Sequence, residues 1–436
     1  MSLGGDAFFL RLSVNTVLHK GIRTMRCVIP VVLFLGILSC SDANQSLPGS
    51  VGAFDTGADI TTDAETMTSQ WPLATPSELG LSAEPLLNLH NDVLQGRYGW
   101  IDSLLIIRDG RIAFEQYYEH DYRAVYGDEA QTLGPLVVNS PSGPYNYFNA
   151  FWHPHYKNTQ LHSMQSVTKS IVSATIGIAI SRGDFPDLDT PVLSFFDIDT
   201  TAHVDDQKRA MTLRHLLTMS EGLRWDENVP YTDPKNTFTV MARSLDWVQF
   251  TLDQPMAREP GTRFNYNSGA SLVLGQIFLQ ATGIDIEAYT AQYLFQPLGI
   301  TEYEWKRTPF GLADTQEGLF LSTRDLAKIA YLYLQKGRWN QKTIIAESWV
   351  NDSLHPSFEL NDELRTGYGF KWWSQRYQYQ DKSYVAYLGK GFGGQRPIIL
   401  PDFDMVIVVT GWNILPDKPF LHAEEAIERV VLSVIE

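Results

Sequence analysis

Residues 161–183 read Leu161-His-Ser-Met-Gln-Ser166-Val-Thr-Lys169-Ser-Ile-Val-Ser-Ala-Thr-Ile-Gly-Ile-Ala-Ile-Ser-Arg182-Gly183, and this stretch decides the fold. From Lys169 onward it is apolar on nearly every side, and a helix that is apolar all round lies inside a core. Arg182 and Gly183 supply a cationic last turn and a capping glycine. The sequence therefore predicts a central buried helix over residues 161–182.

Ser166 and Lys169 form the only Ser-x-x-Lys pattern in the chain, at the start of that helix. Positions i and i+3 share a helix face, so the lysine amine can approach the serine hydroxyl. Burial lowers the pKa of a lysine toward that of a working base, which a serine nucleophile needs. Backbone N–H groups at the helix N-terminus favour a developing oxyanion. The alternative is a hydroxyl-rich first turn with an exposed lysine.

Patterns outside this helix place strands at both ends of the sequence and helices in the middle. Asp109-Gly110 joins two β-rich runs in 103–117, which predicts a hairpin. Further predicted strands are 385–388, 397–400 and 405–410, and predicted helices are 82–89, 212–219, 270–281, 323–335 and 420–436. This predicts an α+β fold, with one antiparallel sheet built from the N- and C-terminal segments, flanked by helices, and a helical lobe. Residues 118–160 are irregular and are expected to cap the site.

Composition excludes several classes of protein. The 436 residues are 44% hydrophobic and 12% aromatic, which excludes a largely disordered chain. A net charge of −16 argues against nucleic-acid binding, which needs a basic surface. The two cysteines, Cys27 and Cys40, are too few for a disulfide framework or a cysteine-based zinc cluster.

The N-terminus is typical of an export signal. Lys20, Arg23 and Arg26 precede an apolar run from Cys27 to Leu38 that is short for a membrane span. The run ends in Gly36-Ile37-Leu38-Ser39-Cys40, which resembles the bacterial lipobox.

We expect residues 1–40 to be a signal peptide, with lipidation at Cys40 and a start at Met1 or Met25. A buried apolar strand or helix is the alternative. Residues 41–78 are expected to be a flexible tether, and 79–436 the functional domain. The protein is then exported to the periplasm and anchored to a bacterial membrane through Cys40.

Several further segments occur in a fixed order after Ser166-Val-Thr-Lys169. They are Leu216-Leu-Thr-Met-Ser-Glu-Gly222-Leu, Pro260-Gly-Thr-Arg-Phe-Asn-Tyr266-Asn-Ser268-Gly-Ala, Leu319-Phe-Leu-Ser-Thr-Arg-Asp325-Leu-Ala and Gly391-Phe-Gly-Gly394-Gln. Together they resemble the serine β-lactamase and penicillin-binding protein superfamily. The class C-like branch is the most similar, with its carboxylesterases, D-aminopeptidases and 6-aminohexanoate-dimer hydrolases. The resemblance covers about residues 79–432.

The resemblance implies roles for residues of the first motif, Ser166-Val-Thr-Lys169, and of the second, Tyr266-Asn-Ser268. Ser166 is the nucleophile, Tyr266 assists proton transfer, and whether Lys169 or Tyr266 takes the first proton stays open. Ser268 stands where the family usually has asparagine. A serine at this position is seen in the 6-aminohexanoate-dimer hydrolase group.

The third motif departs from the family. Phe392 occupies the place of the usual cation, followed by Gly393 and Gly394. Lys390 lies on the same face as residue 392 if the strand is regular. The backbone N–H groups of Ser166 and Gln395 are expected to form the oxyanion hole. Loss of the cation disfavours β-lactam and peptidoglycan substrates.

The sequence thus predicts a serine hydrolase that cleaves a small-molecule amide or ester through an acyl-enzyme on Ser166. The expected substrates are those of a 6-aminohexanoate-dimer hydrolase or an esterase. The alternatives are a β-lactamase or D-alanyl-D-alanine carboxypeptidase, and a non-catalytic or slowly deacylating binding protein. We expect no cofactor, no nucleic acid, and membrane contact only through the lipid anchor.

Two further groups of residues, three histidines and three tryptophans, are expected to have structural roles only. His153, His155 and His162 have no accompanying carboxylate pattern, so no metal site is expected. Trp225, Trp372 and Trp373 are expected to pack in the core, with a pocket wall as the alternative.

Overall fold

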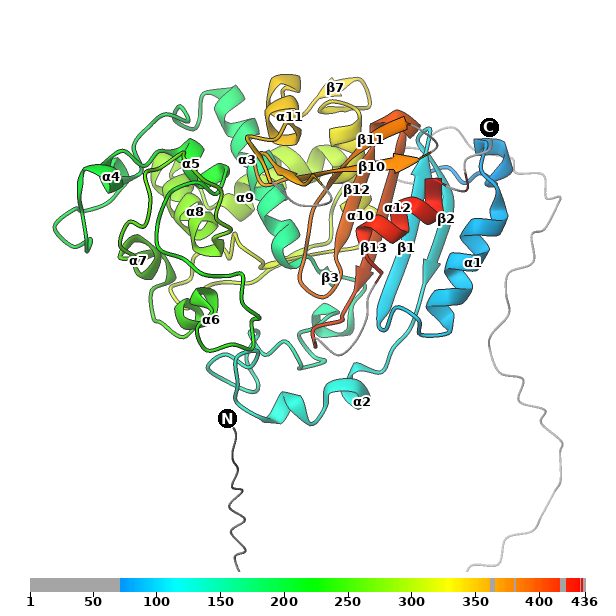
Figure 1. Cartoon of the computed structure of the whole chain (residues 1–436), viewed down its shortest axis with the longest axis horizontal. Coiled ribbons are helices and arrows are strands. Elements are labelled where there is room, and N and C mark those ends of the chain that lie inside the picture. The colour runs from blue at the N-terminus through cyan, green and yellow to red at the C-terminus, as the bar shows by residue number, and fades with distance from the viewer. Residues whose placement is uncertain (1–70, 361–364, 380–381, 416–420, 432, 434–436) are drawn as a thin grey trace, which may run out of the picture. The chain divides into compact units, whose positions relative to one another are not determined.

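The computed structural model describes residues 71–436 except 361–364, 380–381, 416–420, 432 and 434–436 (Figure 1). The predicted signal peptide 1–40, the lipidation site Cys40 and residues 41–70 of the predicted tether lie outside the described residues, so these stay predictions.

An antiparallel sheet of eight strands forms the centre of the domain, in the order β2-β1-β13-β12-β11-β10-β9-β8. Its strands are β1 (Ile101–Arg108), β2 (Arg111–Tyr117), β8 (Phe358–Glu359), β9 (Gly367–Tyr368), β10 (Trp373–Tyr379), β11 (Lys382–Leu388), β12 (Arg396–Leu400) and β13 (Met405–Gly411). The first strand β1 pairs with the last strand β13, which confirms the predicted sheet from both ends of the chain. The expected hairpin turns at Asp109 and Gly110, both with positive φ.

Both faces of the sheet are buried, and alternate residues of the central strands face different helices. Leu104 and Ile106 of β1 join a cluster with α1 (Ala83–Leu94) and α12 (Ala423–Val431). Leu105 and Ile107 join the larger cluster that contains α3 (Thr168–Arg182), α8 (Ser268–Thr282) and α10 (Thr323–Leu334). The helical lobe thus lies on one face of the sheet and the terminal helices on the other (Figure 1).

The central helix α3 begins later than its sequence predicts. His162–Ser163 form a short strand, β3, which pairs with β5 (Leu319–Leu321), and Gln165–Val167 form a 3₁₀ turn. The predicted start at Leu161 was therefore wrong, because tertiary strand pairing overrides the local helical pattern. From Thr168 to Ala179 every residue is buried, as predicted, and Gly183 caps the helix in the left-handed conformation.

Shorter elements complete the lobe. The remaining helices are α2 (Tyr122–Tyr126), α4 (Asp206–Arg209), α5 (Leu213–Leu217), α6 (Thr237–Ala242), α7 (Trp247–Leu252), α9 (Ile286–Thr290) and α11 (Glu347–Leu354). The remaining strands are β4 (Glu304–Trp305), β6 (Arg338–Trp339) and β7 (Lys342–Thr343); β4 pairs with β5, and β6 with β7.

Residues 118–160 contain α2 and two 3₁₀ turns but are otherwise irregular, as expected. Their aromatic side chains form a third cluster with α6, α7 and Trp412. This segment therefore has a core of its own although it has little regular structure.

Two residues of 71–78, which the sequence assigns to the flexible tether, contact the rest of the domain. Trp71 packs edge-on against Tyr331 and Trp339, and the backbone of Ala74 bonds to Ile112. The partly buried Trp71 ring holds this stretch against the domain, although its small polar composition indicates flexibility.

Among the described residues, no single helix is long and apolar enough to cross a membrane. The helical segments 268–282 and 286–298 of this part of the chain are together long and apolar enough for a span, but they are bent by 79° relative to each other.

A small residue is required where α3 crosses α11. A Cβ at Gly177 would lie 2.4 Å from ring atoms of the buried Trp349. We expect Gly177→Ala to lower the free energy of unfolding by about 1–3 kcal/mol through overpacking, measured by urea denaturation. Trp349→Phe in the same chain should recover part of the loss, and Gly134→Ala, which has room, serves as control. An unchanged midpoint in Gly177→Ala would contradict this packing.

Candidate active site

Ser166 is the only residue between Leu161 and Ala179 that is not buried, and all of these residues are described. Gln165, directly before it, has a left-handed backbone with φ 49°, which is uncommon for a residue with a side chain. The Gln165 side chain donates to Ser163 Oγ at 2.8 Å and holds this turn. The turn brings one hydroxyl to the surface from an otherwise buried segment.

Lys169 lies beside this hydroxyl. Its Nζ is 2.9 Å from Ser166 Oγ and 2.9 Å from the carbonyl oxygen of Gln316, and the residue is 2% exposed. The predicted i, i+3 contact is thus present. A second backbone acceptor orients the amine, which excludes the alternative of an exposed lysine.

Hydrogen bonds to β5 hold the backbone on both sides of Ser166. The N–H of Met164 donates to Leu319 O at 2.8 Å, and the N–H of Leu319 donates to Thr168 Oγ1 at 3.2 Å. The nucleophile turn is therefore fixed from both ends, which keeps the Ser166 hydroxyl in one place.

Tyr266 precedes α8 and faces the same amine. Lys169 Nζ lies 5.2 Å from the centre of its ring, and the ring stacks on Trp373 at 6.0 Å. Asn267 caps α8 by accepting the N–H of Ala270. The structure therefore brings Ser166, Lys169 and Tyr266 together, while their catalytic roles stay predictions.

Ser268, at the third position of the second motif, bonds to a buried carboxylate. Its hydroxyl donates to Glu227 Oε1 at 2.7 Å, and its N–H donates to Glu227 Oε2 at 2.9 Å. Trp225 Nε1 and the Tyr231 hydroxyl also donate to Glu227. Glu227 is thus a buried carboxylate with four donors, and it holds Ser268 and Tyr231, which line the pocket beside Ser166. Trp225 packs in the core, as expected.

The third motif forms a tight turn, not a regular strand. β11 ends at Leu388, Gly391 pairs with Gln395, and Gly393 and Gly394 have φ of 88° and 122°. The condition of a regular strand, under which Lys390 and Phe392 share a face, is therefore not met. Lys390 Nζ lies 4.9 Å from the Trp373 ring centre.

Phe392 and Gln395 of this turn have different surroundings: Phe392 lies at the pocket, and Gln395 is buried. Phe392 contacts Tyr231 and lines the pocket of Ser166. Gln395 is buried; its side chain donates to Phe392 O and accepts from the N–H of Gly411. Its backbone role in the oxyanion hole stays a prediction.

A narrow pocket with a volume of 10 Å³ adjoins Ser166, about the space of one water molecule. It is lined by Leu136, Tyr147, Gln165, Ser166, Tyr231, Phe238, Ser268, Glu317 and Phe392. Leu136 and Tyr147 belong to segment 118–160, and the Tyr147 hydroxyl donates to Glu317. This segment covers the pocket, in agreement with its expected capping position.

A buried carboxyl group, that of Glu221, and a buried amine, that of Lys371, also lie near the site. Glu221 accepts from Asn267 Nδ2 at 2.7 Å, and Lys371 Nζ donates to Leu216 O at 2.6 Å. Burial raises the pKa of Glu221 to about 7, against the opposing effects of its hydrogen bonds and Lys371. Burial lowers the pKa of Lys371 to about 7, with Glu221 opposing and Lys169 assisting.

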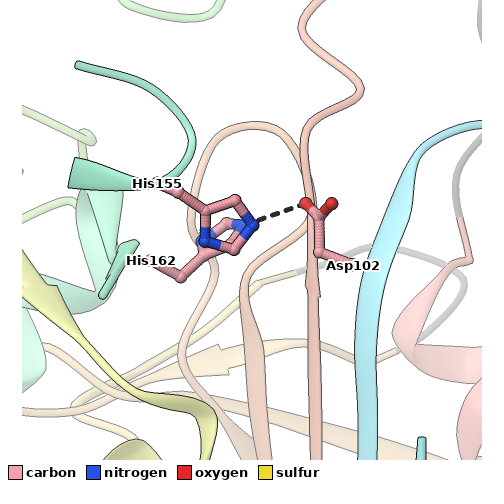
Figure 2. A group of neighbouring side chains, drawn as sticks. All are labelled: Asp102, His155 and His162. Atoms are coloured by element: carbon pink, nitrogen blue, oxygen red, sulfur yellow. Dashed lines mark hydrogen bonds and ion pairs between the residues drawn. The ribbon is translucent and has the colours of Figure 1, made fainter. Parts of the chain in front are cut away.

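The structure also joins two of the three histidines to a carboxylate. Asp102, His155 and His162 lie with their ligand atoms within 4.8 Å of one another (Figure 2). The sequence argument against a metal was the lack of a carboxylate pattern. That argument fails because Asp102 comes from β1, far from both histidines in sequence.

Sequence reasoning missed Glu227, Gln316 and Asp102. Gln316 acts through its carbonyl group, which no sequence pattern reveals. Glu227 precedes Ser268 by a long stretch of chain, and only the fold brings the two together.

The chain matches the family model described as Beta-lactamase over residues 102–427. It is 24% identical over 329 residues to 6-aminohexanoate-dimer hydrolase of Paenarthrobacter ureafaciens, covering 70% of this chain and 79% of that protein. These matches confirm the resemblance seen in the sequence.

The chain is also 27% identical over 186 residues to monacolin J acid methylbutanoyltransferase of Aspergillus terreus. This match covers 42% of each protein, so the chain matches less than half the length of this curated relative. Among solved structures, a putative beta-lactamase from Bacteroides dorei DSM 17855 has a TM-score of 0.58 and 18% identity, covering 82% of this chain and 100% of that one. That similarity confirms the fold.

The Glu221–Lys371 pair predicts a pH dependence of stability. Between pH 4.5, the usual pKa of the free side chain, and about 7, folded Glu221 holds a proton that the unfolded chain has released. The contribution of Glu221 to the free energy of unfolding is therefore fully present below pH 4.5 and is lost as the pH rises through about 7. Glu221→Gln, which keeps an acceptor for Asn267, should remove this loss.

The measurement is urea denaturation at several values between pH 5 and 8. The stability of Glu221→Gln relative to the wild type should improve as the pH rises. The exposed Glu259→Gln is the control. A constant difference across this range would show that Glu221 does not titrate in the folded state.

Proposed function

Because the chain belongs to the beta-lactamase family, we propose that it is a serine hydrolase that cleaves an amide or ester through an acyl-enzyme on Ser166. One observation carries the proposal: Lys169 Nζ lies 2.9 Å from Ser166 Oγ, at the only point where this segment reaches the surface. A hydroxyl held against an amine in this way is a nucleophile beside its base.

The reaction proceeds in two halves. Ser166 Oγ attacks the carbonyl carbon, and its proton passes to Lys169 Nζ directly or by way of Tyr266. The backbone N–H of Ser166 and one from the turn 391–395, which the family resemblance assigns to Gln395, stabilise the oxyanion. The leaving amine or alcohol takes the proton. Water then attacks the acyl-enzyme, and Ser166 regains its proton as the acid is released.

The pocket favours a slender, uncharged acyl group. Phe392 and Phe238 contribute apolar surface, while the acidic side chain in the lining, Glu317, faces Lys306 at 3.6 Å. No cation among the described residues lines this pocket, so a substrate carboxylate gains no partner there. This supports a linear amide or ester substrate, as for a 6-aminohexanoate-dimer hydrolase or an esterase. A β-lactamase or carboxypeptidase is the less favoured alternative.

Acyl transfer is the second candidate, favoured by the similarity to a methylbutanoyltransferase. The first half of the reaction is the same, and an alcohol replaces water as the acceptor of the acyl group. An alcohol acceptor yields a new ester in place of the free acid, so the product distinguishes the two reactions.

Covalent labelling tests the nucleophile. We expect a fluorophosphonate probe to label Ser166, and Ser166→Ala to lose the label and at least ~10³-fold in kcat/KM for p-nitrophenyl butyrate. Lys169→Ala should slow labelling strongly, because the hydroxyl loses its base. Mass spectrometry locates the adduct.

Ser173→Ala is the matched control, since this buried α3 hydroxyl has no hydrogen-bond partner within the described structure. It should keep its labelling rate. Equal labelling in Lys169→Ala would contradict the mechanism. Labelling of Ser166 together with a single burst of p-nitrophenol from p-nitrophenyl butyrate, without further turnover, would identify a slowly deacylating binding protein.

A matched pair of esters tests the acyl pocket. We expect p-nitrophenyl butyrate to exceed p-nitrophenyl hemisuccinate in kcat/KM by about 10–100-fold, the range for one missing charge-assisted contact. Nitrocefin should be turned over slowly for the same reason. Product analysis with an added alcohol separates acyl transfer from hydrolysis. Faster turnover of hemisuccinate or nitrocefin would favour a β-lactamase-like activity.

A further inference from the structure

A buried histidine makes two contacts that a neutral imidazole cannot satisfy. His162 Nε2 lies 3.0 Å from Asp102 Oδ2, and His162 Nδ1 lies 3.0 Å from the carbonyl oxygen of Ser163. Both neighbours are acceptors, and a neutral imidazole has one N–H. If Nδ1–H donates to Ser163, the Nε2 lone pair faces a carboxylate oxygen, and this short contact needs either a second ring proton or a bound metal ion.

Asp102 is oriented for such a role. It is 4% exposed, and its Oδ1 accepts the Tyr122 hydroxyl at 2.8 Å, which leaves Oδ2 facing His162. Among the described residues, His162 is its one ion-pair partner. A buried carboxylate without a lysine or arginine needs a positive charge from elsewhere.

His155 supplies a third donor atom. Its Nδ1 is buried and has no hydrogen-bond partner in the described part of the chain, although the side chain as a whole is half-buried. The two rings lie edge to face, with centres 5.1 Å apart.

The spacing of these atoms fits one ion. Zinc lies about 2.0–2.2 Å from nitrogen and oxygen ligands, so two neighbouring ligands are about 3–3.5 Å apart. The 3.0 Å between His162 and Asp102 meets this distance. The third atom is within 4.8 Å, and a small rotation of the half-buried His155 side chain closes the set.

A path from solvent is also present. Asp102 and His155 line an open pocket of 620 Å³, which has room for water to complete the coordination. The Nδ1 contact of His162 with a backbone carbonyl is the usual outer-shell arrangement of a metal-bound histidine.

We propose that Asp102, His155 and His162 bind one divalent transition-metal ion of the zinc type (Figure 2). Two imidazoles and one carboxylate suit zinc and its neighbours better than calcium or magnesium. The ion fastens three segments together: strand β1, the capping segment 118–160, and strand β3, which leads into the Ser166 turn. It stabilises the fold and holds the cap, and no catalytic step passes through it.

Metal binding to the full chain tests this site. After chelator treatment and dialysis, calorimetry should give one Zn²⁺ per chain with a Kd near or below about 1 µM, and Zn²⁺ should raise the Tm. Co²⁺ should show the visible absorption of a low-coordinate site. Asp102→Asn, which keeps the acceptor for Tyr122, and His155→Ala should each weaken binding at least ~10-fold.

Controls separate this site from other metal ligands. The exposed His203→Ala should bind as the wild type does, and so should a variant with Cys27→Ser and Cys40→Ser. If Asp102→Asn does not fold, His155→Ala still decides, because its side chain is half-buried. The proposal is overturned if neither Zn²⁺ nor Co²⁺ binds, if binding survives both ligand substitutions, or if it is lost only with the cysteines. His162 is then an imidazolium paired with Asp102.

Discussion

A buried lysine amine is the constraint on which the site depends. Lys169 is 2% exposed in a helix without a polar face, and its Nζ has two oxygen neighbours, Ser166 Oγ and Gln316 O. Burying a polar or charged nitrogen without partners costs several kcal/mol. The fold therefore has to bring both oxygens to the amine. The pairing of β3 with β5 and the turn at Gln165 are the means by which it does so.

The same requirement explains how the site walls are built. Glu227 has four donors around its carboxylate, one of which is the Ser268 hydroxyl. The Ser268 hydroxyl is thereby bonded to Glu227, and the carbonyl oxygen of Gln316 is the second oxygen neighbour of Lys169. The serine at this motif position thus serves a buried carboxylate of the site.

Segment 118–160 links the pocket to the rest of the domain. Tyr147 lines the pocket. The Tyr126 hydroxyl donates to the carbonyl oxygen of Trp412, directly after β13, and Trp412 Nε1 donates to the backbone carbonyl oxygen of Tyr147. A cap packed through aromatic rings with bonded hydroxyl groups is held in a defined position. Its position narrows the pocket at Ser166, and the proposed metal ion would fasten the same segment to β1 and β3.

The sequence by itself determined the fold class, the buried central helix and the Ser166–Lys169 pair, because periodicity and an i, i+3 spacing are local properties. It also placed Tyr266 and Phe392 at the site through ordered motifs. It misplaced the start of α3, since the pairing of His162–Ser163 with β5 joins residues far apart in the chain. Only the tertiary structure decided the partners of Ser268 and Lys169 and the meeting of Asp102 with His155 and His162. Those contacts depend on where distant strands and turns come to lie, and a carboxylate on β1 carries no local sign of the histidines that it meets.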